Sequence, residues 1–86
     1  MTNTAAPTTN RHLTNILAAH DMIAHADANT RGATFDGWVR YAHIAEYVDI
    51  AEADIIDAID TCAHEMTSPT HKVTALRPDA FQAERI

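Results

Sequence analysis

The sequence predicts a mainly α-helical, α+β fold, with three helices followed by a small β-hairpin and a short C-terminal helix. The chain has 86 residues, and 47% of them are apolar. Because 17 of these are alanines, 23 larger apolar side chains remain, enough for one compact core but too few for two domains. Apolar residues recur at helical spacing in three successive stretches, whereas a later stretch alternates apolar and polar residues as a strand does.

The first helix is predicted over residues 11–27, at the start of a single domain of residues 10–86. Residues 1–9 are small and polar and contain Pro7, so we expect a flexible tail with nothing to bury. Asn10 is the predicted N-cap, because its side chain can accept a hydrogen bond from a free N–H of the first turn. One face of this helix is formed by Leu13, Ile16, Leu17, His20, Ile23 and Ala24.

Several of the six histidines have an expected role in this scheme. His20 lies within the apolar face, where a single histidine is more often a hydrogen-bonded core or dimer-interface residue than a ligand. His25 with Asp21, and His64 with Asp60, are spaced as surface pairs worth roughly a few tenths of a kcal/mol. Protonation of all six histidines would cancel the net charge of −6, so a pH-responsive assembly is one further alternative.

Two more helices are predicted over residues 38–48 and 52–65. The preceding stretch, Asn29 to Gly37, holds both glycines and predicts a loop, with a short strand near Thr34–Phe35. Asp36 can cap the second helix. The inner face of the second helix is formed by Trp38, Tyr41, Ala42, Ile44, Ala45 and Val48. The inner face of the third helix is formed by Ile55, Ile56, Ile59, Cys62, Ala63 and Met66.

The C-terminal part of the chain predicts a turn, a strand and a last short helix. Ser68 to His71 is rich in turn-forming residues. Lys72 to Leu76 alternates and is rich in β-forming residues. Pro78 and Asp79 then begin the predicted short helix, which contains Phe81.

The segment from Ile44 to Ala58 resembles a helix-turn-helix. Ala45 is a small residue in mid-helix, where the following helix has to cross closely, and Val48 and Ile50 flank the turn. The glycine usual in such a turn is replaced by Asp49, which tolerates the left-handed conformation moderately well. In a helix-turn-helix, the second helix is the one presented to a DNA groove.

The residues that follow extend the resemblance to the winged helix-turn-helix regulators. The strand Lys72–Leu76 and the segment Arg77–Phe81 are similar to the wing and closing segment of that family. Residues 11–81 then match the order helix, loop, helix, turn, helix, wing, helix. The alternative is a three-helix bundle with a β-hairpin and no role in nucleic-acid binding, because any three-helix domain needs similar apolar spacing.

The charge of the motif argues against the DNA binding that the resemblance implies. Residues 41–71 contain seven acids and no Lys or Arg, and Asp54 and Asp57 would face the groove. DNA affinity comes largely from the neutralisation of phosphates, so this surface is unsuited to DNA. We therefore expect a non-enzymatic regulatory protein that binds a protein partner, such as the basic surface of a nucleic-acid-binding protein.

The candidate protein-binding residues lie on the outer face of the third helix and at the end of the second: Tyr47, Asp54, Asp57, Thr61 and His64. One alternative is a dimeric DNA-binding regulator that contacts phosphates through Arg31, Arg40, Lys72 and Arg77. Another is that the acidic face only keeps the protein in solution. A candidate patch for dimerisation or docking is formed by Met22, Val39, His43 and Tyr47.

No pattern in the sequence predicts catalysis, a cofactor or a metal site. Ser68 is the sole serine and has no glycine elbow, and the two glycines form no phosphate-binding loop. Cys62 falls on a buried face and has no C-x-x-C partner, and the histidine spacings match no metal motif. We therefore do not expect an enzyme.

The sequence also predicts a cytoplasmic protein without membrane contact. One cysteine allows no intramolecular disulfide, and no apolar run approaches the ~18 residues that a membrane span needs. The first ten residues contain no hydrophobic stretch of the kind found in secretory signals. Arginine outnumbers lysine five to one, which is typical of a GC-rich coding sequence such as that of an actinobacterium or one of its phages.

Overall fold

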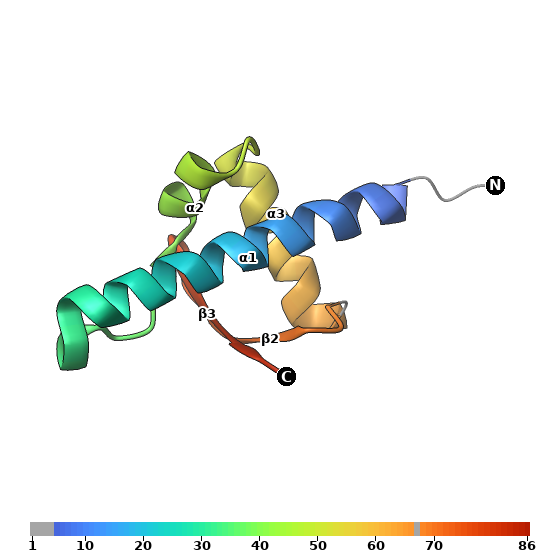
Figure 1. The fold of residues 1–86 in the computed structure, drawn as a ribbon. Helices are drawn as coiled ribbons and strands as arrows, with labels where there is room; N and C mark the ends of the chain where they lie inside the picture. The colour runs from blue at the N-terminus through green and yellow to red at the C-terminus, as the bar shows by residue number, and fades with distance from the viewer. Residues whose placement is uncertain (1–4, 67) are drawn as a thin grey trace.

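The computed structural model describes residues 5–66 and 68–86, and it describes side chains from residue 12 onward. Its elements are α1 (Ala5–Arg31), the 3₁₀ turn η1 (Gly32–Thr34), β1 (Val39–Arg40), α2 (Tyr41–Tyr47), α3 (Glu52–Glu65), β2 (His71–Leu76) and β3 (Ala80–Arg85). The long helix α1 runs across the molecule and contacts α2, α3 and β1 (Figure 1). Three helices and a three-stranded antiparallel sheet confirm the α+β class.

The sheet has the strand order β1-β3-β2, with the C-terminal strand β3 in the middle. β2 and β3 are joined by residues 77–79 and form a β-hairpin (Figure 1). A register shift between Val73 and Ala75 leaves Thr74 as an extra residue, which is a β-bulge. β1 pairs with the start of β3, so that Val39 lies opposite Phe81.

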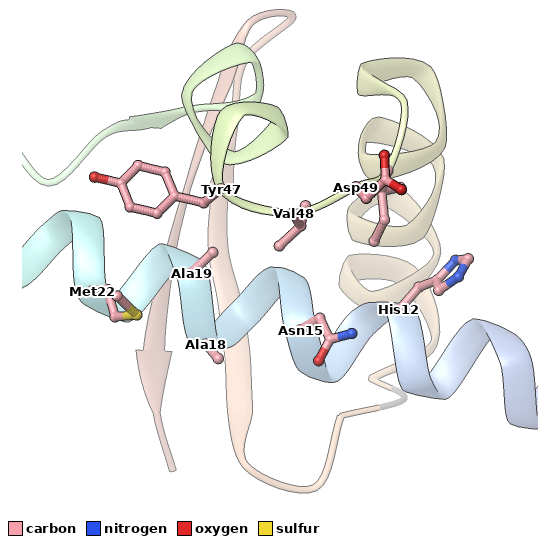
Figure 2. A pocket seen from close by; sticks show the side chains of 9 residues that line it. His12, Asn15, Ala18, Ala19, Met22, Tyr47, Val48 and Asp49 are labelled. Atoms are coloured by element: carbon pink, nitrogen blue, oxygen red, sulfur yellow. The ribbon is translucent and has the colours of Figure 1, made fainter.

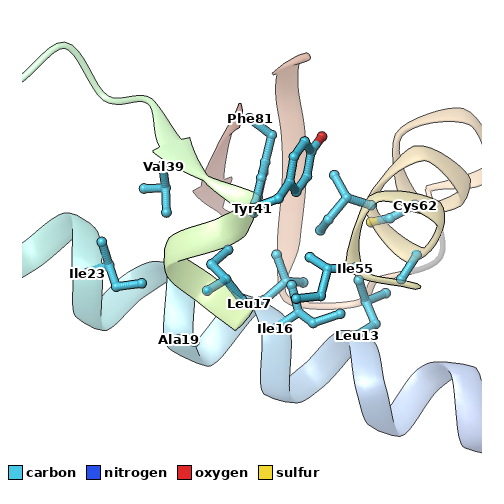
Figure 3. Close-up of a cluster of buried hydrophobic side chains, with 13 residues drawn as sticks. Leu13, Ile16, Leu17, Ala19, Ile23, Val39, Tyr41, Ile55, Cys62 and Phe81 are labelled. Atoms are coloured by element: carbon cyan, nitrogen blue, oxygen red, sulfur yellow. The ribbon is translucent and has the colours of Figure 1, made fainter. Parts of the chain in front are cut away.

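The core lies where α1, the other two helices and the sheet meet (Figure 3). Phe81 of β3 is fully buried and stacks on Tyr41 of α2, with ring centroids 5.4 Å apart. The other fully buried large side chains are Ile16, Leu17, Ile23, Val39, Ile44, Ile55 and Ile59. Each such side chain stabilises the fold by about 1.5–3 kcal/mol relative to an exposed position.

The first helix is longer at both ends than the sequence predicts. α1 begins at Ala5, so residues 5–9 are helical rather than a tail, and Asn10 lies inside the helix rather than at its N-cap. Residues 1–4 of the predicted tail lie outside the described residues. Pro7 is tolerated because the first four N–H groups of a helix have no intrahelical partner. The helix ends before Gly32, whose φ of +57° suits glycine.

The second helix is shorter than predicted, and the strand before it lies elsewhere. Trp38 is not helical, and Val39 and Arg40 form β1 with β3 as partner. The strand predicted near Thr34–Phe35 is absent, because Thr34 ends the 3₁₀ turn. Asp36 does not cap a helix; its carboxylate accepts a hydrogen bond from the backbone N–H of Trp38 at 3.1 Å.

The third helix, α3, has the predicted bounds, and the turn before β2 is also confirmed. The predicted C-terminal helix is wrong, because residues 80–85 form β3. Ala80 and Phe81 are buried, and the strand pairs on both sides, with β1 and with β2. These strand partners outweigh the weak local helix preference of the segment. In the part of the chain that is described, no helix is long and apolar enough to cross a membrane.

Candidate functional site

The outward side of α3 is acidic. Its inward side consists of Ile55, Ala58, Ile59 and Cys62, and the rotation of about 100° per residue places Asp54, Asp57 and Asp60 on the opposite side. All three carboxylates are exposed. Among the described residues, no Lys or Arg lies within 4.0 Å of any of the three, and only Asp60 has a basic neighbour, His64 at 3.6 Å. We call these three residues the acidic face.

Three of the predicted protein-binding residues come together on one side of α3. Asp54, Asp57 and Thr61 line a cavity of about 340 Å³ with Ala58 and with His12 of α1. His64 lies one turn further along α3 and is exposed. Its Nδ1 lies 2.9 Å from the backbone carbonyl of Asp60 and donates a hydrogen bond to it.

Tyr47, the fifth predicted residue, lines a different hollow. This hollow has a volume of about 530 Å³ and lies between α1 and the α2–α3 turn (Figure 2). We call it the α1–α2 groove, and its lining residues are His12, Asn15, Ala18, Ala19, Met22, Tyr47, Val48, Asp49 and Ile50. Tyr47 and Met22 are 55% and 62% exposed, which is high for large apolar side chains. His12 also lines the cavity beside the acidic face, so the two hollows are adjacent at this side chain.

The four residues of the predicted docking patch do not form one surface in the structure. Tyr47 and Met22 share the α1–α2 groove. Val39 is only 1% exposed, because it belongs to the core side of β1, so its predicted outward position is wrong. His43 is half-buried, and its ring lies 5.5 Å from that of Tyr47, but it lines a third cavity, at the N-terminal end of α2.

This third cavity brings together three of the four predicted DNA-contacting cations. It has a volume of about 380 Å³, and we call it the Trp38 cavity; its lining residues are Asp27, Arg31, Asp36, Trp38, Val39, Arg40, His43, Arg77, Asp79 and Ala80. The guanidinium of Arg77 lies 3.9 Å above the ring of Trp38, within cation–π distance. Within residues 5–66 and 68–86, no carboxylate lies within 4.0 Å of Arg31, Arg40 or Arg77. Lys72 lies elsewhere, in a hollow between α3 and β2.

A hydrogen-bonded cluster around Asp21 joins α1 to the sheet. The Asp21 carboxylate accepts a hydrogen bond from Nε2 of His71 at 2.8 Å and from Nδ1 of His20 at 3.2 Å. Arg85 of β3 lies 3.8 Å from the same carboxylate. The predicted pair of Asp21 with His25 is therefore wrong; the ring of His25 accepts a hydrogen bond from Asn29 instead.

Burial and hydrogen bonding shift the pKa of two groups in this cluster. Burial lowers the pKa of His20, and the hydrogen bond and charge of Asp21 only partly oppose this effect. Partial burial acts to raise the pKa of Asp21, but the hydrogen bonds and charges of His71 and His20 outweigh it, so the pKa is lowered. Nε2 of His20 is buried and has no hydrogen-bond partner among the described residues. His20 is thus the buried, hydrogen-bonded residue that its position in the apolar face predicts.

The side chains of Ser68 and Cys62 contribute to the fold, Ser68 in a turn and Cys62 in the core. The hydroxyl oxygen of Ser68 accepts hydrogen bonds from the backbone N–H groups of Thr70 and His71, which fixes the turn before β2. Cys62 is 2% exposed in the core. In the part of the chain that the structure describes, no three His, Cys, Asp or Glu side chains converge in a way that could hold a metal ion.

The sequence could have indicated part of the Asp21 cluster. The inward–outward alternation of β2 extends back to His71, so its inward direction follows from the pattern of Val73 and Ala75. Its partner on α1 lies 50 residues away, and no local pattern indicates that pairing. The same is true of the Trp38 cavity, where Arg77 meets residues from three other segments.

Comparisons of the chain with protein-family models, with curated proteins and with solved structures find no match in any of the three. The acidic face, the α1–α2 groove and the Trp38 cavity are therefore the features on which a functional assignment depends.

Proposed function

We propose that this protein is a non-enzymatic interaction domain of the winged helix-turn-helix type, which binds a partner protein with a basic surface through the acidic face of α3. One observation above all supports this proposal. Three exposed carboxylates, Asp54, Asp57 and Asp60, share one side of α3, and no Lys or Arg among the described residues lies within 4.0 Å of them. Unpaired charges of one sign on an exposed helix attract an oppositely charged protein and steer its approach.

The order of the elements supports the winged architecture. The described chain runs α1, β1, α2, α3, β2, β3, and β3 lies between the other two strands. Residues 48–51 connect α2 to α3 in four residues, a length typical of a helix-turn-helix. The β2–β3 hairpin, with Arg77 in its turn, follows α3 in the chain as a wing would, which supports the proposal.

The same architecture makes DNA an unfavourable ligand for α3 itself. If α3 entered a groove, Asp54 and Asp57 would approach phosphates, and repulsion would replace the neutralisation on which DNA affinity depends. A basic protein surface, such as that of a nucleic-acid-binding protein, would instead pair with these carboxylates. Salt should weaken such a complex, because exposed charges are screened within a Debye length of about 10 Å at 0.1 M.

Charge reversal on α3 tests the proposal. A photo-crosslinking residue at Thr61 would capture the bound partner in an extract of the source cells, for identification by mass spectrometry. We expect Asp54→Lys with Asp57→Lys to abolish capture of that partner. The control Glu46→Lys with Glu84→Lys changes the net charge equally at exposed positions outside every cavity described above, and it should leave capture unchanged. Equal capture by all three proteins would contradict a role for the acidic face.

DNA binding through the Trp38 cavity is a second candidate function, and the meeting of three cations supports it. Arg31, Arg40 and Arg77 line one cavity, and none of the three guanidinium groups is neutralised by a carboxylate within 4.0 Å in the described structure. Arginine side chains around a cavity beside a hairpin turn can contact phosphates without the acidic face of α3 touching DNA.

Fluorescence anisotropy with duplex DNA at ~50 mM salt tests this second function, because low salt favours phosphate contacts. Arg40→Gln should weaken binding and reduce its salt dependence, whereas Lys72→Gln, outside the cavity, should change neither. An absence of binding by the unmodified protein at this salt would remove the DNA function and leave the protein-binding proposal standing.

A further inference from the structure

We infer that the partner enters as a cationic amphipathic helix, which lies in the α1–α2 groove with its apolar side and reaches the acidic face with its basic side. This inference rests on the proposed function and names the kind of partner. It joins two observations: a groove with large exposed apolar side chains, and an adjacent cavity that is lined by carboxylates and shares His12 with the groove.

The shape of the groove suits a helix. Its floor is formed by Ala18 and Ala19 of α1, whose small side chains allow another backbone to approach closely. Its ends are marked by Met22 and Tyr47 on one side and by His12 and Asp49 on the other (Figure 2). His12 and Met22 are ten residues apart on α1, about 15 Å at 1.5 Å per residue. Three turns of a second helix match this length.

An extended peptide would find no free strand edge in this groove with which its backbone could form hydrogen bonds. The lining residues come from α1, from the end of α2 and from the turn before α3, and none of them belongs to a strand. A peptide in β-conformation needs the free edge of a sheet for its backbone hydrogen bonds. A helix satisfies its own backbone groups and requires only side-chain contacts.

The charges around the groove select a basic occupant. Asp49 lines the groove itself, and His12 leads from the groove to Asp54 and Asp57. Lysines or arginines on one side of the bound helix would meet these three carboxylates, while its apolar residues would cover Tyr47 and Met22. A second copy of this chain is a poorer occupant, because its net charge is −6 and its own α3 is acidic.

A designed peptide serves as the probe. It has about 16 residues of Leu, Lys and Ala, with leucines along one face and lysines beside them, and it bears a fluorophore for anisotropy measurements. A second peptide has glutamate in place of each lysine, and a third has the same composition in an order without an apolar face. We expect the first peptide to bind the full-length protein and the other two to bind at least tenfold more weakly.

Two sets of variants separate this inference from the proposed function. Met22→Ala with Tyr47→Ala removes the two large exposed apolar side chains of the groove, and it should weaken binding of the first peptide about tenfold. Asp54→Lys with Asp57→Lys should weaken it to a similar extent. The control Met66→Ala with Ile86→Ala removes two apolar side chains that are 70% and 83% exposed outside the groove, and it should have no effect. Circular dichroism would verify that all three variants fold.

Four results would overturn the inference. If only the Asp54/Asp57 variant loses affinity, the acidic face binds cations without the groove, and the proposed function survives. If the glutamate peptide binds as well as the lysine peptide, the occupant is not cationic. If the unmodified protein sediments as a dimer and Ala18→Arg as a monomer, a second copy covers the groove. If no peptide binds, the groove does not accept a helix of this kind.

Discussion

The imidazole of His71 donates a hydrogen bond to the carboxylate of Asp21 at 2.8 Å, although 50 residues separate them in the chain. This bond ties the first residue of β2 to the middle of α1. The other ring nitrogen, Nδ1, lies 2.8 Å from the hydroxyl of Thr70, and because a carboxylate only accepts, Nε2 is the nitrogen that bears the proton. The pair therefore fixes the N-terminal end of β2, and with it the β2–β3 hairpin, against the longest helix.

Asp21→Ala should destabilise the protein by about 1–3 kcal/mol, because it leaves the buried His71 ring without its acceptor. Urea unfolding followed by circular dichroism measures this change. The matched control is His25→Ala, an exposed residue that the sequence alone would pair with Asp21, and it should change stability by less than about 0.5 kcal/mol. Equal effects of the two substitutions would contradict the assignment of the hydrogen bond between His71 and Asp21.

Stability should fall as the pH drops below the ordinary imidazole pKa of roughly 6.5, and His20 should account for part of the fall. Burial lowers the pKa of His20, so in this range the unfolded chain binds a proton that the folded protein does not. The unfolded state then gains relative stability until the pH reaches the lowered pKa. His20→Leu should reduce the slope of melting temperature against pH between 7.5 and 5.5. An unchanged slope would show that other histidines cause the dependence.

The lowered pKa of Asp21 acts on stability in the same sense as that of His20, but at lower pH. Its pKa is lowered in the folded protein, so its contribution is complete above the ordinary carboxyl pKa of roughly 3.9 and is lost as the pH falls through the lowered value. As the pH falls from the ordinary to the lowered pKa of Asp21, the stability of the unmodified protein should therefore fall more steeply than that of Asp21→Ala. The effect of His20 begins below roughly pH 6.5 and that of Asp21 only below roughly pH 3.9, so the two variants should depart from the unmodified protein at different points of one titration of melting temperature.

Local periodicity predicted α3 correctly, because the residues within this helix are enough to determine its ends. α3 has its predicted bounds because Ile55, Ile59 and Cys62 follow helical spacing and Met66, at a φ of +52°, ends the helix. The prediction failed at residues 80–85, where the local sequence suits a helix but two strand partners distant in sequence determine β3.

The candidate surfaces, too, could be predicted where they lie within one helix and not where they depend on segments distant in sequence. The acidic face could be predicted because Asp54, Asp57 and Thr61 lie on one side of a single helix. The Trp38 cavity could not, because Arg77 reaches it only through the β2–β3 hairpin turn. Tyr47 was correctly expected at the surface, but the small floor of Ala18 and Ala19 beneath it arises only when α1 packs beside the α2–α3 turn.

Phe81→Ala should destabilise the protein by about 3–5 kcal/mol, the cost of a large cavity in a core. Phe81 has no exposed surface and contacts the rings of both Tyr41 and His20, with centroids 5.4 and 4.9 Å away. Thermal unfolding measures the loss, and Phe35→Ala is the control, because Phe35 is only half-buried at the edge of the core. A loss at Phe81 no larger than that at Phe35 would contradict the central position of β3.

Arg77→Gln should change the fluorescence of Trp38, which is the sole tryptophan of the chain. The guanidinium lies 3.9 Å above the indole ring, so its removal takes away a cation and admits water to that face. The cation–π contact is worth about 0.5–1 kcal/mol at an exposed site, so stability should fall by no more than this. Lys72→Gln is the control for the loss of one positive charge, and it should leave the emission spectrum unchanged, because Lys72 lies in a different hollow. If both substitutions shift the emission equally, the effect comes from net charge and not from the contact. If neither does, Arg77 does not cover Trp38 in solution, and the grouping of three arginines in the Trp38 cavity loses its aromatic anchor.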